Sequence, residues 1–377
     1  MPRREIALLL LANVAATLGV WAFSILVPPG ESVAPGLTLI ERYMDGPSFV
    51  AVAASLYDPA HPVWAAYGDR FGIAELSASH HATVLPLHPL AIRLLAPVFG
   101  WFGALLVLAL VWGSLATLAV YRFLRECGQV TVPFAAALAF TVVPPRWLVY
   151  HSVGANDPAF VLFVVLAITA FRRDHLGWSG LWGGLAAATR IQGVLLFPAL
   201  LAAALLRDRR RAGRSLLLLS PILLALAAVF ALYAWRLDDP WAYFAANAGE
   251  LTVVPFRGLF RSATGGTPAA AFGPVLLYAI AAYGIGWWAR RGEWGVALPC
   301  LALTVLAAFT TLPDVGRFLL AAMPFLLFAP FDAAWSRPEA RWAVIATLPA
   351  VYAYTWACLW DNALAIPVFE SLKAALP

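Results

Sequence analysis

Residues 41–59 place several charged side chains shortly after a long apolar run. Asp45 stands directly before Gly46 and Pro47, and proline suits the first position of a helix because its φ is fixed and it has no N–H to satisfy. From Phe49 onward, apolar residues recur with the spacing of one helix face, which predicts a short helix lying along a membrane surface. Asp45 is then expected at the boundary between water and lipid. The alternative is that its side chain only caps this helix.

An apolar stretch at residues 178–206 is interrupted near Arg190 and Gly193 and is flanked by arginines on both sides. Both flanks are expected in the cytoplasm, because loops on that side are rich in Lys and Arg. The stretch is too short for two full spans, so it predicts two short or re-entrant helices that turn near Arg190. An arginine at membrane depth needs an anionic partner. That partner is either a bound ligand or a buried carboxylate such as Asp157.

Residues 143–158 are expected on the same side of the membrane as Asp45, and they contain Arg146, His151 and Asp157. These side chains are candidates for substrate binding. The alternative is an ordinary proline-rich turn in which Asp157 caps the next helix.

Arg317 is a further candidate, because it follows Asp314 at the start of a late apolar segment on the same side. The alternative for this pair is a simple ion pair between residues three positions apart on a helix.

The histidines His80, His81 and His88 resemble a metal cluster only loosely, since their spacing matches no familiar ligand pattern. We therefore expect neither a metal nor another cofactor. Packing at the interface or hydrogen bonding to a sugar is the favoured role of His81 and His88.

The elements that must position these residues are membrane helices. Charged residues make up 12% of the 377-residue chain, hydrophobic residues make up 62%, and the mean hydropathy is +0.81. Soluble domains contain about 25% charged residues, so the composition indicates an all-α polytopic membrane protein, a single domain over residues 1–377. Hydropathy predicts about 9 to 11 spans. They are expected at residues 6–27, 101–121, 132–148, 157–171, two within 178–206, 215–235, 269–288, 294–312, 316–331 and 342–360.

The arginines orient these spans, because most of them fall in alternate loops. The amino terminus is predicted in the cytoplasm, and residues 28–100 are predicted to form an extracytoplasmic loop with amphipathic interfacial helices, the second at residues 87–99. Nucleic-acid binding is not expected, because no soluble basic face exists. The three cysteines lie far apart and indicate neither disulfides nor zinc.

Several short segments, taken in order, resemble the GT-C superfamily of integral-membrane glycosyltransferases. More narrowly, they resemble the mannosyltransferase branch that includes the second mannosyltransferase of GPI-anchor assembly and its prokaryotic relatives. The chain departs from this pattern at Asp157, where a glutamate is common. The matching segments are residues 42–46 with Asp45, 85–95 with His88, 150–158 with His151 and Asp157, 189–193 with Arg190, and 316–318 with Arg317.

The resemblance implies an inverting transfer of a sugar from a polyprenyl-phosphate donor to a lipid, glycan or protein acceptor, outside the cytoplasm and in a prokaryotic cell membrane. Asp45 is the implied base, since a carboxylate can take the proton of the attacking hydroxyl. Arg190, and with it Arg146 and Arg317, is implied to bind the phosphate, because guanidinium offers a planar fork of donors.

Two other functions are compatible with the sequence. In a transporter or flippase of an anionic or lipid-linked substrate, Arg190 and Asp157 would line the path, but transporters are often built from internal repeats and none is found. The second alternative function is that of an inactive relative that acts as an assembly scaffold.

Overall fold

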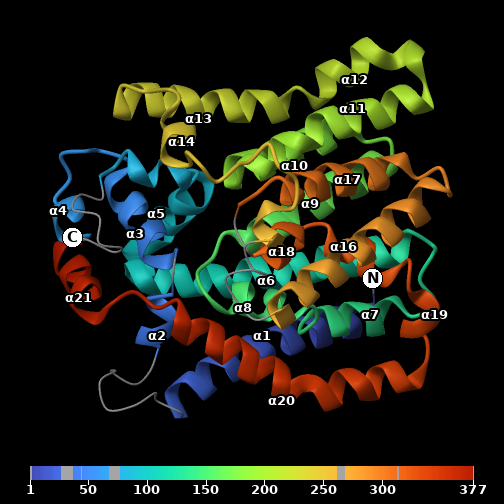
Figure 1. Ribbon diagram of the computed structural model, residues 1–377, viewed down its shortest axis with the longest axis horizontal. Coiled ribbons are helices and arrows are strands. Elements are labelled where there is room, and N and C mark those ends of the chain that lie inside the picture. The colour runs from blue at the N-terminus through green and yellow to red at the C-terminus, as the bar shows by residue number, and fades with distance from the viewer. Residues whose placement is uncertain are drawn as a thin grey trace.

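The computed structural model describes residues 2–26, 37–43, 45–67, 77–260, 268–311 and 314–376, and these residues form helices and no strands (Figure 1). The predicted all-α polytopic architecture is therefore confirmed. The main helices are α1 (Arg3–Leu26), α2 (Thr38–Glu41), α3 (Gly46–Ser55), α4 (Val63–Tyr67), α5 (Leu87–Phe99), α6 (Trp101–Glu126), α7 (Pro133–Phe140), α8 (Pro145–Ser152), α9 (Asp157–Arg172), α10 (Leu176–Thr189), α11 (Leu196–Arg207), α12 (Ala212–Leu219), α13 (Pro221–Leu237), α14 (Ala242–Ala246), α16 (Pro268–Ala289), α17 (Trp294–Ala308), α18 (Val315–Leu319), α19 (Asp332–Trp335), α20 (Pro338–Asp361) and α21 (Ile366–Ala375). Shorter turns are η1 (His80–Thr83), η2 (Ile191–Leu195), η3 (Arg209–Arg211) and η4 (Pro324–Phe328).

Among the described residues, five helices are long and apolar enough to cross a membrane, or six if α8 and α9 are taken as one bent span. The five are α1, α6, the joined α12 and α13, α16 and α20. Helices α8 and α9 meet at 114°. Four shorter apolar helices accompany them within the described residues, at residues 46–55, 87–99, 191–207 and 294–308, and this count by length and composition does not decide the predicted number of 9 to 11 spans.

Two of the predicted spans are interrupted. The span expected at residues 132–148 is divided between α7 and α8, and Pro145 opens α8, because proline can start a helix but cannot continue one. The span expected at residues 316–331 consists of α18 and a short π-helical turn, η4. Both interruptions lie beside residues that face the site described below.

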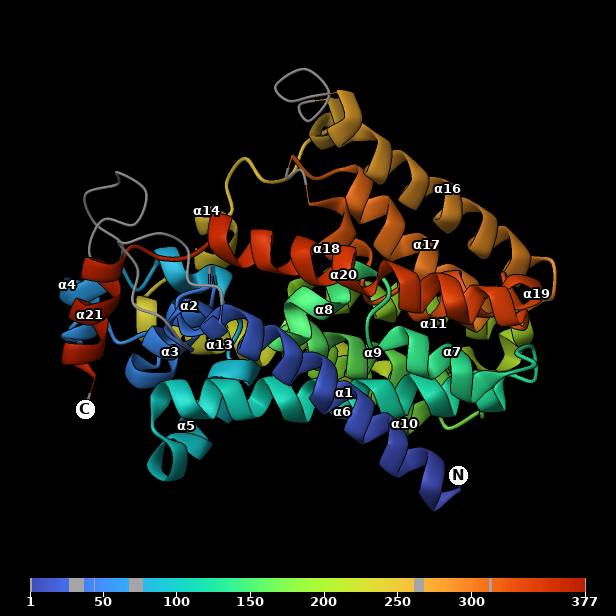
Figure 2. The same ribbon diagram turned by 90° about the horizontal axis from the view of Figure 1, so that it is seen from below.

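Helix α9 runs through the middle of the molecule and is buried along almost its whole length (Figure 2). It packs against α6 and α10. At its carboxyl end Arg172 pairs with Glu293 at 2.8 Å, and Arg173 pairs with Glu126. Asp157 is the first residue of α9, at the end opposite to these pairs. One end of the bundle is therefore closed by charged pairs, and the other holds the candidate site.

Helix α10 is fixed against α12 and α13 through glycines. A Cβ atom on Gly180 would lie 2.1 Å from the carbonyl oxygen of Leu218, and one on Gly184 would lie 2.8 Å from that of Pro221. Small residues four positions apart allow such close approach of helices in membranes. This packing fixes the end of α10, where Arg190 follows.

The chain breaks at Arg190, as predicted. Its φ of −146° and ψ of 136° are extended, between the end of α10 and the start of η2. Gly193 permits the tight turn, since a Cβ there would lie 2.4 Å from the backbone nitrogen of Ala187.

The predicted surface helix after Asp45 is wrong in its environment. All residues of α3 are buried, and the helix packs against α5 and α6 (Figure 2). Its other face contains Ala, Ser and Gly, which are small enough to be buried as well. The helix predicted at residues 87–99 is α5, with large apolar side chains exposed on one face: Leu90 45%, Leu94 78% and Val98 75%. Parts of the preceding loop, residues 27–36 and 68–76, lie outside the described residues.

Candidate active site

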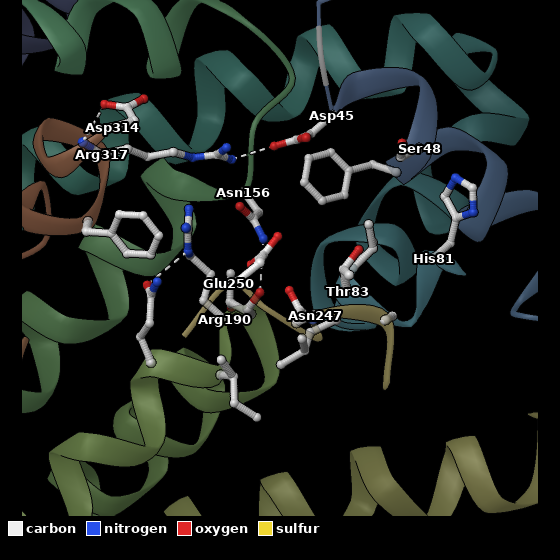
Figure 3. Close-up of a pocket in the computed structure, with 18 of the residues that line it drawn as sticks. Asp45, Ser48, His81, Thr83, Asn156, Arg190, Asn247, Glu250, Asp314 and Arg317 are labelled. Carbon is white, nitrogen blue, oxygen red and sulfur yellow. Dashed lines mark hydrogen bonds and ion pairs between the residues drawn. The ribbon is translucent and has the colours of Figure 1, made fainter. Parts of the chain in front are cut away.

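A cavity of about 520 Å³ opens where α3, α9 and α18 begin and α10 ends (Figure 3). Five of the residues predicted from the sequence line it: Asp45, His81, Arg146, Arg190 and Arg317. The wall also contains Tyr43, Ser48, Phe49, His80, Thr83, Val84, Leu85, Tyr150, Asn156, Thr189, Ile191, Gln192, Tyr243, Ala246, Asn247, Glu250, Asp314, Phe318 and Asn362. Segments from across the chain therefore converge on one polar chamber.

The Asp45 carboxylate does not cap α3, since its side chain makes no capping hydrogen bond. The capping alternative is therefore wrong. Instead, Asp45 Oδ2 accepts a hydrogen bond from Arg317 Nη2 at 2.5 Å (Figure 3). The Asp45 side chain keeps 28% of its surface exposed, so a ligand in the cavity can reach it.

Asp157 lies behind the residues that line the cavity and binds both Arg190 and Arg317. Arg317 donates to it from Nε at 3.3 Å and from Nη2 at 3.1 Å, and Arg190 donates from Nη1. Only 3% of the Asp157 side chain is exposed. Asp157 thus orients both guanidinium groups and does not cap the helix.

Arg190 has a protein carboxylate as its partner, which was the alternative to a bound ligand. Nη1 donates to Asp157, and Nε donates to Gln192 Oε1 at 3.2 Å. Within the described part of the chain, Arg190 Nη2 has no hydrogen-bond acceptor, and 13% of the side chain is exposed to the cavity. The ion pair and a ligand contact are therefore compatible.

Arg190→Lys is expected to lower sugar transfer by about 10²-fold while the protein stays folded, because lysine keeps the charge next to Asp157 but loses the fork of donors. Thermal stability and transfer rate should be measured on the same preparation. Arg172→Lys is the matched control, since Arg172 makes a comparable two-pronged pair with Glu293 at the other end of α9. A stable Arg190→Lys protein with full activity would exclude a role in phosphate binding.

The simple ion pair expected between Asp314 and Arg317 is not what forms. The Asp314 carboxylate caps α18 by accepting from the Arg317 backbone N–H at 3.1 Å. It also accepts from the Tyr150 hydroxyl at 2.9 Å and pairs with Arg146 Nε at 3.1 Å. The guanidinium of Arg317 is left to face Asp45. Burial opposes the charged form of Arg317, but Asp157 and Asp45 outweigh it and raise its pKa well above the usual value.

The three predicted histidines have different positions. His81 lines the cavity, with its Nδ1 3.0 Å from the Ser77 carbonyl oxygen. His88 and His151 are not among the lining residues. His88 Nε2 lies 3.2 Å from the Gly154 carbonyl oxygen, and burial lowers its pKa to about 4. His151 Nδ1 lies 2.7 Å from the Trp147 carbonyl oxygen. Of His81, His88 and His151, the structure therefore brings only His81 to the cavity, where the neighbouring His80 also lies.

Sequence reasoning missed the wall that α14 and the following turn provide. Tyr243, Asn247 and Glu250 all face the cavity. Their spacing of four and three residues is that of one helix face. A polar stripe with helical spacing in an otherwise apolar segment was the signal that could have identified them.

No protein-family profile matches the chain, and no curated protein matches it in sequence. The fold is nonetheless shared with solved structures, although sequence identity to them is low. The chain is similar to ArnT from Cupriavidus metallidurans bound to undecaprenyl phosphate, with 17% identity and a TM-score of 0.53 over 91% of this chain and 63% of that one. It is also similar to the archaeal oligosaccharyltransferase AglB from Archaeoglobus fulgidus in complex with an inhibitory peptide and a dolichol-phosphate, with 14% identity and a TM-score of 0.55 over 98% of this chain and 55% of that one.

The chain therefore spans between 55% and 63% of the length of these two structures. The similarity confirms the predicted fold. The mannosyltransferase branch that the motifs resemble stays a prediction.

Proposed function

We propose that the protein is an inverting glycosyltransferase that moves a sugar from a polyprenyl-phosphate donor to a lipid, glycan or protein acceptor. The observation that carries the proposal is the arrangement of one accessible carboxylate, Asp45, beside the guanidinium groups of Arg317, Arg190 and Arg146 in one chamber. The shared fold supports it, since ArnT is bound to undecaprenyl phosphate and AglB to a dolichol-phosphate.

In the proposed reaction, the acceptor oxygen attacks the anomeric carbon of the donor sugar while its proton passes to an Asp45 carboxylate oxygen. The bond between the anomeric carbon and the phosphate oxygen breaks, and its electron pair leaves with that oxygen. The products are the glycosylated acceptor and the polyprenyl phosphate. Guanidinium groups stabilise the negative charge that develops on the leaving oxygen.

The pair between Asp45 and Arg317 must loosen for this reaction, because a carboxylate held by a guanidinium is a weaker base. The donor phosphate offers Arg317 a second anion. Asp157 would keep Arg317 in place during the exchange, since it binds the same guanidinium from the buried side.

A purified preparation in lipid bilayers should release polyprenyl phosphate from a labelled polyprenyl-phosphate sugar when acceptor is supplied. Mannose is the first sugar to test, because the motifs resemble a mannosyltransferase branch, and donors that carry other sugars follow. Binding without transfer by every donor and acceptor combination would favour the inactive-scaffold function. Movement of lipid-linked sugar across the bilayer without bond cleavage would favour the transporter.

We also propose that the cavity opens on the extracytoplasmic side. A cysteine at Ser77, an exposed residue next to the cavity histidine His81, should react with an impermeant maleimide in intact cells. Cysteine at the exposed Arg210 should react only after permeabilisation. Both variants need a background that lacks the partly exposed Cys358. The reverse labelling pattern would place the cavity in the cytoplasm.

A further inference from the structure

The charges around the cavity do not balance. Four carboxylates, of Asp45, Asp157, Asp314 and Glu250, accompany the guanidinium groups of Arg146, Arg190 and Arg317 among the described residues of the site. A donor phosphodiester adds another negative charge. If all four carboxylates are ionised, an anion would enter a chamber that is already negative, which opposes binding in a partly buried site.

Glu250 differs from the other three carboxylates. Asp45, Asp157 and Asp314 each bind an arginine side chain. The Glu250 side chain makes no hydrogen bond or ion pair within the described part of the structure. Its backbone is fixed, because its carbonyl oxygen accepts from the Thr311 N–H at 2.8 Å. Figure 3 shows Glu250 beside Arg190 and Asn247, so its carboxyl group is held at the ligand-binding surface.

The groups that act on Glu250 come from several elements. Its pKa depends on the charges of Asp45 before α3, Arg190 after α10 and Arg317 in α18. Burial and the charge of Glu250 in turn raise the pKa of Tyr243 in α14. Turn η1, which packs against α14, contributes His80 and His81 to the same cavity.

We propose that the cavity binds a lipid-linked phosphate more tightly when Glu250 carries a proton, so that binding of the donor is coupled to proton uptake at this side chain. This inference rests on the proposed function and adds a regulatory property to the same site.

The electrostatic setting supports it. Burial and then the charge of Asp45 raise the pKa of Glu250, while Arg317 and Arg190 lower it. A bound phosphate adds a negative charge and takes up part of the positive charge of these two arginines, so the pKa of Glu250 should be higher in the complex than in the free protein. Affinity is then greatest below the free-state pKa, falls as the pH rises toward the bound-state pKa, and is constant above it.

The test is a binding titration over pH 5–9 with a probe that does not itself change charge. Undecaprenyl methyl phosphate is suitable, because a diester keeps one negative charge over this range and carries no sugar to be mismatched. Calorimetry in buffers of different ionisation enthalpy gives the number of protons taken up. For the wild type, we expect uptake approaching one proton and an affinity that falls by up to about tenfold per pH unit between the two pKa values.

Glu250→Gln should lose this uptake and bind the probe with nearly the same affinity throughout, because the amide is neutral and similar in shape. Glu370→Gln, at an exposed position in α21, should behave as the wild type. His81→Gln tests whether the proton is instead taken up by the histidine in the same cavity, and it should keep the wild-type proton uptake. The inference would be overturned if Glu250→Gln took up protons as the wild type does, or if only His81→Gln lost the proton uptake. It would also be overturned if binding of the probe required Mg²⁺ or Mn²⁺ in place of the proton. Failure of both proteins to bind the diester at any pH would instead reject the proposed function, and this inference with it.

Discussion

Asp45→Asn is expected to lower sugar transfer by about 10²- to 10⁴-fold, the range contributed by a general base, while the protein stays folded. Asparagine keeps the size of the side chain and an oxygen that can accept from Arg317, but it cannot take up the proton of the acceptor hydroxyl. No helix cap is lost, because the Asp45 side chain does not cap α3. Transfer and thermal stability should be measured on the same preparation.

Asp58→Asn is the matched control for this variant. Asp58 lies after α3 in the same loop, is 42% exposed and pairs with Arg236 at 3.4 Å, outside the cavity. It should retain transfer. Near-normal activity of Asp45→Asn would exclude Asp45 as the base, and an equal loss in both variants would point to general damage to this segment.

Asp157→Asn is expected to lower the free energy of unfolding by about 3–5 kcal/mol, as when one partner of a buried ion pair is removed. It leaves Arg190 without its carboxylate and removes one of the two that bind Arg317. Transfer should fall as well, because both guanidinium groups lose the contact that orients them. Thermal unfolding in detergent and transfer per folded molecule separate the two effects.

Asp332→Asn provides the control, since Asp332 bonds to Thr131 away from the cavity. Exchanging Asp157 and Arg190 should not restore stability, because the new arginine at position 157 would lie against Arg317. Restoration by the exchange would show that Arg317 does not depend on Asp157. An unchanged unfolding temperature in Asp157→Asn would show that the pairs contribute little.

The sequence predicted the features that depend on neighbouring residues or on overall composition. Apolar content identified the helical membrane fold, and the arginine-rich flanks together with segment length predicted the turn at Arg190. The same reasoning identified Asp157 as the alternative partner of Arg190, and this pair is present. The helix at residues 87–99 was predicted with its bounds.

What the sequence could not show depends on tertiary contacts. Arg317 and Asp45 are 272 positions apart, and no local pattern links them. The i, i+3 spacing favoured Asp314 as the partner of Arg317, but the cap of α18 and Arg146 engage that carboxylate instead. The periodicity of α3 predicted one apolar face, whereas small residues allow all its faces to be buried. Hydropathy alone did not detect interruptions such as that at Pro145.

The exposed apolar face of α5 has a consequence for how such a protein meets its substrate. Helix α5 packs against α3, and Arg93 on α5 donates to the carbonyl oxygen of Ala53 at 2.8 Å. Leu94 and Val98 on the same helix are exposed, so they offer an apolar surface on which the lipid chain of the proposed donor would lie. Under the proposed function, the donor then diffuses to the cavity in two dimensions, and the rate follows its mole fraction in the bilayer. Added detergent or inert lipid would dilute the substrate at constant bulk concentration.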